Sequence, residues 1–197
     1  MNAVRNSLLP IILVCVLVGF GCSSVEVQPD VDRVEIAEAV YLSLPKADSI
    51  TYSVDATQIL VADYGERSHT FEVQLEIRPG RITIASVNMW GGTLFSVMYD
   101  GSSVHTQRAF DEAGFDPKYL LADFLLTRWD ADWLSEHLQG ADLNENANGM
   151  GRILSRDGEP VIEISYDTAD RWAGRTRFTH LERAYVLDIQ TVGMSGS

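Results

Sequence analysis

Hydrophobic and polar residues alternate with a period of two through much of the chain. The clearest example is the segment 71–77, Phe-Glu-Val-Gln-Leu-Glu-Ile. This alternation is typical of a strand with one buried face and one solvated face. Pro79-Gly80 follows and favours a turn, so segments 71–77 and 81–87 are predicted to pair as a hairpin.

Further segments of the same kind predict a serial antiparallel sheet. They lie at 58–62, 93–99, 103–108, 152–155, 161–166, 175–181 and 185–192, and the Asp100-Gly101 and Asp157-Gly158 pairs provide turns. A series of about nine or ten short strands favours a meander over a parallel sheet. The predicted fold class is therefore mainly β, with one short helical insertion.

The helical insertion is predicted between residues 116 and 140. Asp116 suits a helix cap and Pro117 the first helical position, after which the apolar residues repeat with helical spacing at Leu120, Leu121, Phe124 and Leu125. A second helical segment begins at Asp130 and ends at Gly140. Residues 141–151 are polar and predict an exposed loop. A single curved sheet must cover its apolar concave face, and these helices are the expected cover.

The N-terminus indicates export and lipidation. An apolar run from Leu8 to Phe20 ends at Gly21-Cys22 and is too short to cross a bilayer. The pattern is typical of a bacterial lipoprotein signal removed before Cys22, which is then acylated; the alternative is ordinary cleavage that leaves Cys22 as a free thiol. We therefore expect a signal peptide at 1–21, a tether at 22–33 and one domain at 34–197.

Composition excludes several functions. The formal net charge of −13 argues against nucleic acid and against a polybasic membrane patch, so any membrane contact must be apolar or covalent. The histidines have no partner at metal-ligand spacing, and no nucleophile or phosphate-loop motif is present. The sequence therefore predicts no enzyme, no metal and no cofactor; a hydrolase that uses an exposed Ser is the weakest alternative.

Several short segments together resemble an uncharacterised group of bacterial lipoproteins. The resemblance is carried by Glu72-Val-Gln-Leu-Glu-Ile, Leu94-Phe-Ser-Val-Met-Tyr-Asp-Gly, Tyr119-Leu-Leu-Ala-Asp, Ile164-Ser-Tyr-Asp and Trp172-Ala-Gly. Members of this group are often encoded with aryl polyene pigment clusters and are similar in architecture to LolB, the outer-membrane receptor for lipoproteins. Arg171 departs from the pattern, because Pro is expected before the Trp.

The resemblance implies a LolA/LolB-like antiparallel half-barrel covered by helices, with a cavity for acyl chains. It also implies a protruding loop that touches the membrane, which corresponds here to Met89 and Trp90. The alternative is that Trp90 folds back and plugs the barrel. Ser23 after the cysteine implies sorting to the outer membrane, so the expected location is its periplasmic face, anchored by the N-terminal lipid.

The leading hypothesis is an apolar cavity that binds acyl chains of a lipid, a lipoprotein or an aryl polyene lipid and assists their transfer or membrane insertion. Its expected lining is Phe71, Val73, Leu75, Leu94, Met98, Phe124 and Leu125. A packed core would use the same residues. The alternative is a tethered, non-catalytic scaffold or interaction protein with a filled core. The expected partners are outer-membrane lipid, an acyl-chain ligand or lipoprotein, and a periplasmic carrier protein.

Overall fold

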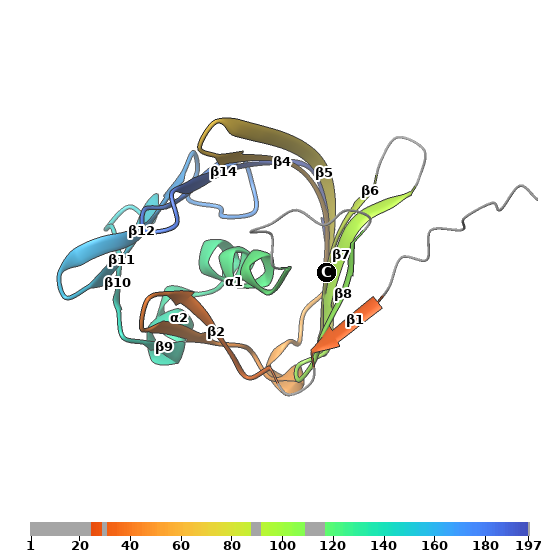
Figure 1. Ribbon diagram of the computed structural model, residues 1–197, viewed down its shortest axis with the longest axis horizontal. Coiled ribbons are helices and arrows are strands. Elements are labelled where there is room, and N and C mark those ends of the chain that lie inside the picture. The colour runs from red at the N-terminus through yellow and green to blue at the C-terminus, as the bar shows by residue number, and fades with distance from the viewer. Residues whose placement is uncertain (1–24, 29–30, 88–91, 109–116, 197) are drawn as a thin grey trace, which may run out of the picture.

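One long, strongly curved antiparallel sheet dominates the fold (Figure 1). The computed structural model describes residues 25–28, 31–87, 92–108 and 117–196. Within these ranges the sheet has eleven strands in the order β1-β8-β7-β6-β5-β4-β14-β13-β12-β11-β10. The strands are β1 (Val25–Gln28), β4 (Val54–Tyr64), β5 (Arg67–Arg78), β6 (Arg81–Val87), β7 (Thr93–Tyr99), β8 (Val104–Arg108), β10 (Asp142–Glu145), β11 (Gly151–Arg156), β12 (Glu159–Tyr166), β13 (Arg175–His180) and β14 (Tyr185–Gly196).

Two meanders make up this sheet, and one long strand pair joins them. β4 to β8 pair in sequence order, as do β10 to β14, and β14 then pairs with β4 so that Leu60 lies opposite Ile189. The strands predicted at 81–87 and 93–99 are found at those bounds, as β6 and β7. The prediction of a mainly β, antiparallel half-barrel covered by helices is confirmed.

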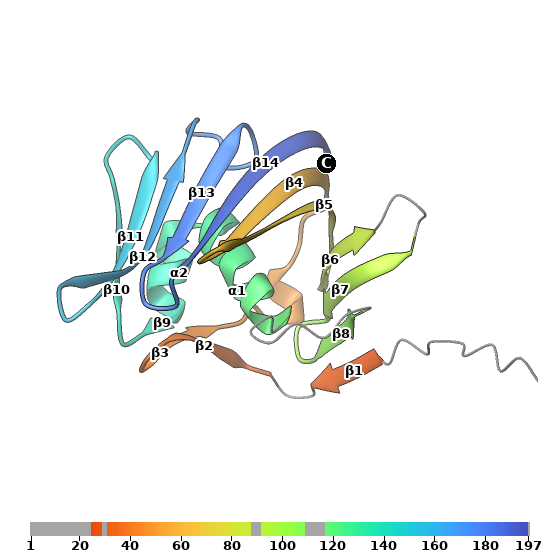
Figure 2. The same ribbon diagram turned by 45° about the horizontal axis from the view of Figure 1, so that its top comes forward.

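Helix α1 (Pro117–Arg128) lies inside the curve of the sheet, as Figures 1 and 2 show. Its residues from Leu121 to Arg128 are all buried, because the sheet lies on one side of the helix and other elements lie on the other. Helix α2 (Ala131–His137) follows directly. Asp130, the predicted start of this segment, caps the helix: its carboxylate accepts hydrogen bonds from the backbone N–H groups of Asp132 and Trp133 at 2.9 and 3.2 Å.

A second, small sheet covers the side of α1 away from the main sheet (Figure 1). It contains β2 (Arg33–Ala37), β3 (Val40–Ser43) and β9 (Leu138–Gln139), and a 3₁₀ turn, η1 (Ala47–Ser49), follows β3. Its apolar side chains are buried: Val34, Ile36, Val40 and Leu42 are each at most 2% exposed. The hydrophobic core therefore has three layers, with α1 in the middle.

Two segments differ from the sequence-based expectation. The prediction of a loop at 141–151 is wrong for its first part, because β10 pairs with β11 and places Leu143 opposite Leu154. β10 is an edge strand, so water can reach its polar side chains. Its sequence therefore lacks the apolar–polar alternation that would have predicted a strand. The expected tether also contains structure, since β1 pairs with β8. No helix in the described ranges has the length and apolar character needed to cross a membrane.

Candidate functional site

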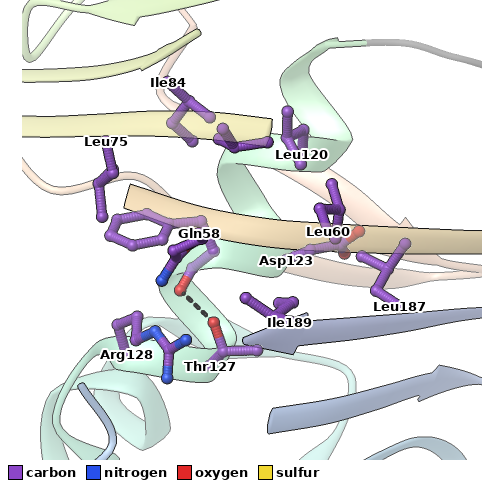
Figure 3. Close-up of a pocket in the computed structure, with 12 residues that line it drawn as sticks. Gln58, Leu60, Leu75, Ile84, Leu120, Asp123, Thr127, Arg128, Leu187 and Ile189 are labelled. Atoms are coloured by element: carbon purple, nitrogen blue, oxygen red, sulfur yellow. Dashed lines mark hydrogen bonds between the residues drawn. The ribbon is translucent and has the colours of Figure 1, made fainter. Parts of the chain in front are cut away.

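A narrow apolar gap separates α1 from the concave face of the main sheet (Figure 3). The helix contributes residues at spacings of three and four, which share one face: Leu120, Asp123, Phe124, Thr127 and Arg128. The opposite wall comes from β4, β5, β6 and β14, whose inward side chains are Gln58, Leu60, Val73, Leu75, Ile84, Leu187 and Ile189. The lining is apolar along most of its length, and its polar groups are few.

The gap is small in this conformation. Its volume is about 30 Å³, which is room for about one water molecule. Pockets that enclose a ligand usually measure about 300–1,000 Å³. The interior of the half-barrel is therefore close to filled, and an acyl chain can enter only if α1 or the lining side chains move.

The structure brings together some of the residues expected to line a cavity. Val73, Leu75 and Phe124 line the gap. Leu125 is fully buried but outside the lining, on a different face of α1. Phe71 also lies outside the lining and packs edge-on against Phe95, with ring centroids 5.6 Å apart.

The inward face of β7 differs from the expected one. Phe95, Val97 and Tyr99 are the buried residues of this strand, and the expected Leu94 and Met98 alternate with them and lie outside the gap lining. The reason is that both faces of the segment Thr-Leu-Phe-Ser-Val-Met-Tyr are largely apolar, so alternation alone does not select one. Cys22, Met89 and Trp90 lie outside the described residues.

Arg128 provides a buried positive charge at one end of the gap. Its residue surface is 6% exposed, and burial lowers the pKa of Arg128 to about 10, so it stays protonated at neutral pH. Its Nη1 donates to the backbone oxygen of Arg171 and to Thr176 Oγ1, the latter at 2.9 Å. Its Nε and Nη2 are buried without a hydrogen-bond partner among the described residues.

Two further arginines lie near the same end of α1 and share one carboxylate. Arg152 donates to the Leu126 and Trp129 carbonyl oxygens, both at 2.7 Å, which satisfies the end of the helix. Its Nε bonds Glu145 at 2.8 Å, and Arg171 Nη2 bonds both oxygens of Glu145 at 2.6 and 2.7 Å. Burial opposes ionisation of Glu145, but the hydrogen bonds and charges of these arginines lower its pKa overall.

The gap lining also contains one buried carboxyl group, Asp123, and one buried side-chain amide, Gln58. Burial raises the pKa of Asp123 to about 7, although the hydrogen bond that Tyr185 Oη donates to it at 2.7 Å opposes this shift. Gln58 Nε2 donates to Thr191 Oγ1 at 3.3 Å. Sequence analysis missed Asp123 and Arg128. Asp123 interrupts an apolar helical stripe, a signal that could have found it, whereas Arg128 is the last residue of α1 and gives no such signal.

A second cavity lies between η1, the β7–β8 turn and α2. Its volume is about 650 Å³, and its lining includes Asp32, Lys46, Asp48, Trp133 and His137. Because this cleft is wide, open and substantially polar, water can fill it at little cost. The gap beside α1 is the stronger candidate site, since it combines an apolar lining with a buried charge that lacks a carboxylate partner among the described residues.

These features define the fold as an antiparallel half-barrel that encloses a central helix and an apolar gap. The chain belongs to the DUF3261 family, described as "Protein of unknown function", and the match spans residues 55–193. No curated protein matches the chain.

Two solved structures show distant likeness. One is a candidate outer membrane lipoprotein-sorting protein domain from Vibrio parahaemolyticus, with 8% identity, a TM-score of 0.43, and coverage of 74% of this chain and 85% of that chain. The other is a DUF1329 family protein from Desulfovibrio piger, with 11% identity, a TM-score of 0.28, and coverage of 75% of this chain and 86% of that chain.

Proposed function

We propose that this protein binds the apolar chain of a lipid between α1 and the concave face of the main sheet. The observation that carries the proposal is the gap between α1 and the sheet, which is lined mainly by apolar side chains, most of them from the sheet, and which has a buried cation at one end. From Leu120 to Arg128 the helix rises about 12 Å, at 1.5 Å per residue. That length suits an extended hydrocarbon segment, and the walls offer the aliphatic contacts it needs.

Entry of a chain requires the N-terminal end of α1 to move away from the sheet. The second half of the helix is held by side-chain hydrogen bonds, which join Tyr185 to Asp123, Arg152 to the Leu126 oxygen, Tyr166 to the Thr127 oxygen and Arg128 to Thr176. Apolar contacts such as those of Leu120 are not directional, so a hydrocarbon chain can replace them at little net cost. In this proposal the narrow gap widens as a chain enters beside Leu120.

In this proposal the protein is non-catalytic and stands on the periplasmic face of the outer membrane, anchored through Cys22. It receives an acyl chain of a lipid, a lipoprotein or an aryl polyene lipid and passes it on. The signal-like N-terminus and the acidic composition support this placement, because they leave a covalent lipid as the source of anchoring. A tethered interaction protein is the alternative function, and the nearly filled interior favours it.

Displacement of a fluorescent fatty acid tests the proposal. The full chain carrying Cys22→Ser, which has no acyl group of its own, is expected to bind the probe saturably at one site and to release it to dodecanoate. Leu120→Trp places a larger side chain at the proposed entrance and should weaken binding at least tenfold. Leu181→Trp is the matched control, since Leu181 is exposed on the β13–β14 turn, away from the gap.

Two results would contradict the proposal. Absence of saturable binding by protein that circular dichroism shows to be folded would leave the tethered interaction protein. Binding that Leu120→Trp does not weaken would place the probe elsewhere, and the 650 Å³ cleft would be the next site to examine.

A further inference from the structure

Arg128 has a hydrogen-bonding geometry suited to binding an anion. An arginine side chain carries five N–H donors in a planar fork. Its Nη1 is engaged by the Arg171 oxygen and Thr176, which leaves the edge formed by Nε and Nη2. This edge presents two parallel N–H groups, the arrangement that binds both oxygens of a carboxylate or phosphate.

Burial makes the unpaired edge unusual. A buried donor without an acceptor destabilises the folded state, and a buried charge without a counter-charge does so more strongly. Arg128 is 94% buried, and no carboxylate lies within salt-bridge distance of it among the described residues. A buried charged group with unpaired donors in an otherwise well-packed interior is a candidate for binding a ligand that supplies the acceptors.

The surrounding charges favour an anion at this position. Arg152 and Arg171 lie near the same helix end, and both are paired with the single carboxylate of Glu145. Asp170 contributes a further negative charge near Arg128, but it is exposed and its Oδ1 accepts the backbone N–H of Trp172 at 2.9 Å. Three guanidinium groups thus gather near one buried end of α1. Arg128 also lies over the Trp172 ring, 5.7 Å from its centroid, but it is the one of the three with no carboxylate at salt-bridge distance among the described residues.

We propose that Arg128 binds the anionic head group, carboxylate or phosphate, of a single-chain amphiphile whose apolar chain lies along α1. This inference rests on the proposed function and adds the ligand's class and orientation. The head group lies at Arg128, and the chain extends past Phe124 to Leu120, as the two ends of the lining in Figure 3 indicate. One chain fits this path because α1 offers only one stripe of side chains to the gap.

Asp123 lies beside the path of the chain and does not oppose this orientation. It is five residues before Arg128, about 7.5 Å along the helix axis. Burial keeps its pKa near 7, and Tyr185 bonds it, so its charge is reduced at neutral pH. The remaining side chains between the two positions, Phe124 and Thr127, are apolar or already bonded, since Thr127 Oγ1 donates to the Phe124 oxygen at 2.9 Å.

Calorimetric titration with three ligands of equal chain length tests the inference. The ligands are dodecanoate, dodecyl phosphate and 1-dodecanol, each below its aggregation limit, and the protein is the full chain with Cys22→Ser. We expect at least one anion to bind tenfold or more tightly than dodecanol, because bonds to charged groups are the stronger ones. The anion with the larger preference identifies the head group as carboxylate or phosphate.

Variants then assign the preference to Arg128. Arg128→Met keeps an apolar chain of similar length and removes the fork, so the preference should fall to threefold or less while dodecanol affinity stays within threefold. Arg128→Lys keeps the charge without the two parallel donors and should give an intermediate preference. Arg177→Met is the control, because Arg177 is 54% exposed in its side chain and pairs with Asp188 on the outer surface.

The outcomes separate this inference from the proposed function. If all three ligands bind wild-type protein equally, the head-group site is wrong while chain binding stands. An anion preference that survives Arg128→Met also overturns the role of Arg128. If folded wild-type protein binds none of the three, the proposed function itself fails. Should Arg128→Met fail to fold, the wild-type preference and the Arg128→Lys variant still decide.

Discussion

Asp123 makes the stability of this protein depend on pH. Its pKa is raised from 3.8 to about 7 by burial. At Asp123 the folded state therefore binds more protons than the unfolded state between these values, so the contribution of Asp123 to the free energy of unfolding falls as pH rises from about 4 to about 7, opposite in sign to that of Glu145, whose pKa is lowered. At about 1.4 kcal/mol per pH unit, the change from this group reaches about 4 kcal/mol. Urea unfolding at pH 4.5 and pH 7.5 measures it.

The variant Asp123→Asn isolates this contribution. Asparagine keeps the size of the side chain and can accept the hydrogen bond from Tyr185 Oη, but it does not titrate. We expect its unfolding free energy to vary less with pH than that of wild type over the same window. Asp142→Asn, on the exposed face of edge strand β10, should retain the wild-type dependence. Parallel curves for wild type and Asp123→Asn would contradict the assignment.

Glu145 neutralises the positive charge of Arg152, which is buried away from water. Arg152 is fully buried, and Glu145 is the carboxylate that its Nε contacts. Glu145→Ala leaves this guanidinium without a counter-charge and should lower the free energy of unfolding by about 3 kcal/mol. Glu145→Gln should cost less, because the amide oxygen still accepts a hydrogen bond. Chemical denaturation measures both, with Glu163→Ala on the solvated face of β12 as a control expected within about 0.5 kcal/mol of wild type.

At the scale of the elements, two turns that look alike in sequence differ in packing. Asp100-Gly101 and Asp157-Gly158 both have glycine at positive φ, +89° and +84°. A Cβ at Gly101 would lie 2.4 Å from the backbone nitrogen of Ala47 in η1, whereas one at Gly158 would meet nothing within 4 Å. Gly101→Ala should therefore destabilise the fold by about 2 kcal/mol or more, and Gly158→Ala by about 1 kcal/mol. Thermal melts compare the two; equal losses would contradict the tight contact with η1.

The strands differ in how far the sequence could predict them. Strand β5 has one apolar and one polar face, so its pattern identified both the element and the face that carries the buried Val73, Leu75 and Ile77. β7 is apolar on both faces, and only its pairing with β6, where Val97 lies opposite Ile84, selects the inner one. β10 has no apolar face to reveal it. Glu145 of this strand accepts a hydrogen bond from Arg171, 26 residues further along the chain, and no local sequence pattern predicts this contact.

The candidate site was predictable only in part for the same reason. Val73, Leu75 and Phe124 follow from period-two and helical spacing. The sequence around Arg128 does not distinguish it from an arginine at the exposed end of a surface helix. Arg128 is buried by Trp172 and by Thr176 of β13. Its guanidinium carbon lies 5.7 Å from the centroid of the Trp172 ring, and its Nη1 donates to Thr176 Oγ1. Both come from the far meander of the sheet, so the tertiary fold is needed to see the site.

The whole molecule leaves its main sheet open and fills the resulting concavity with α1. β1 and β10 are the two edges of the sheet, and the small sheet and α2 cover the remaining side of the helix (Figure 2). This arrangement gives two uses to the same apolar surface, since the concave face can pack against α1 or against a ligand. A change that improves the first contact should therefore weaken the second.

Val73→Ile tests this competition. The added methyl group is close in size to the gap of about 30 Å³, and burying it should raise the free energy of unfolding by up to about 0.8 kcal/mol. Because it fills space that a chain must use, affinity for dodecanoate should fall. Val61→Ile, on the outer face of β4, is the matched control and should change neither quantity. Lower stability with unchanged affinity would mean that α1 and the sheet already meet at Val73, and that any chain binds elsewhere.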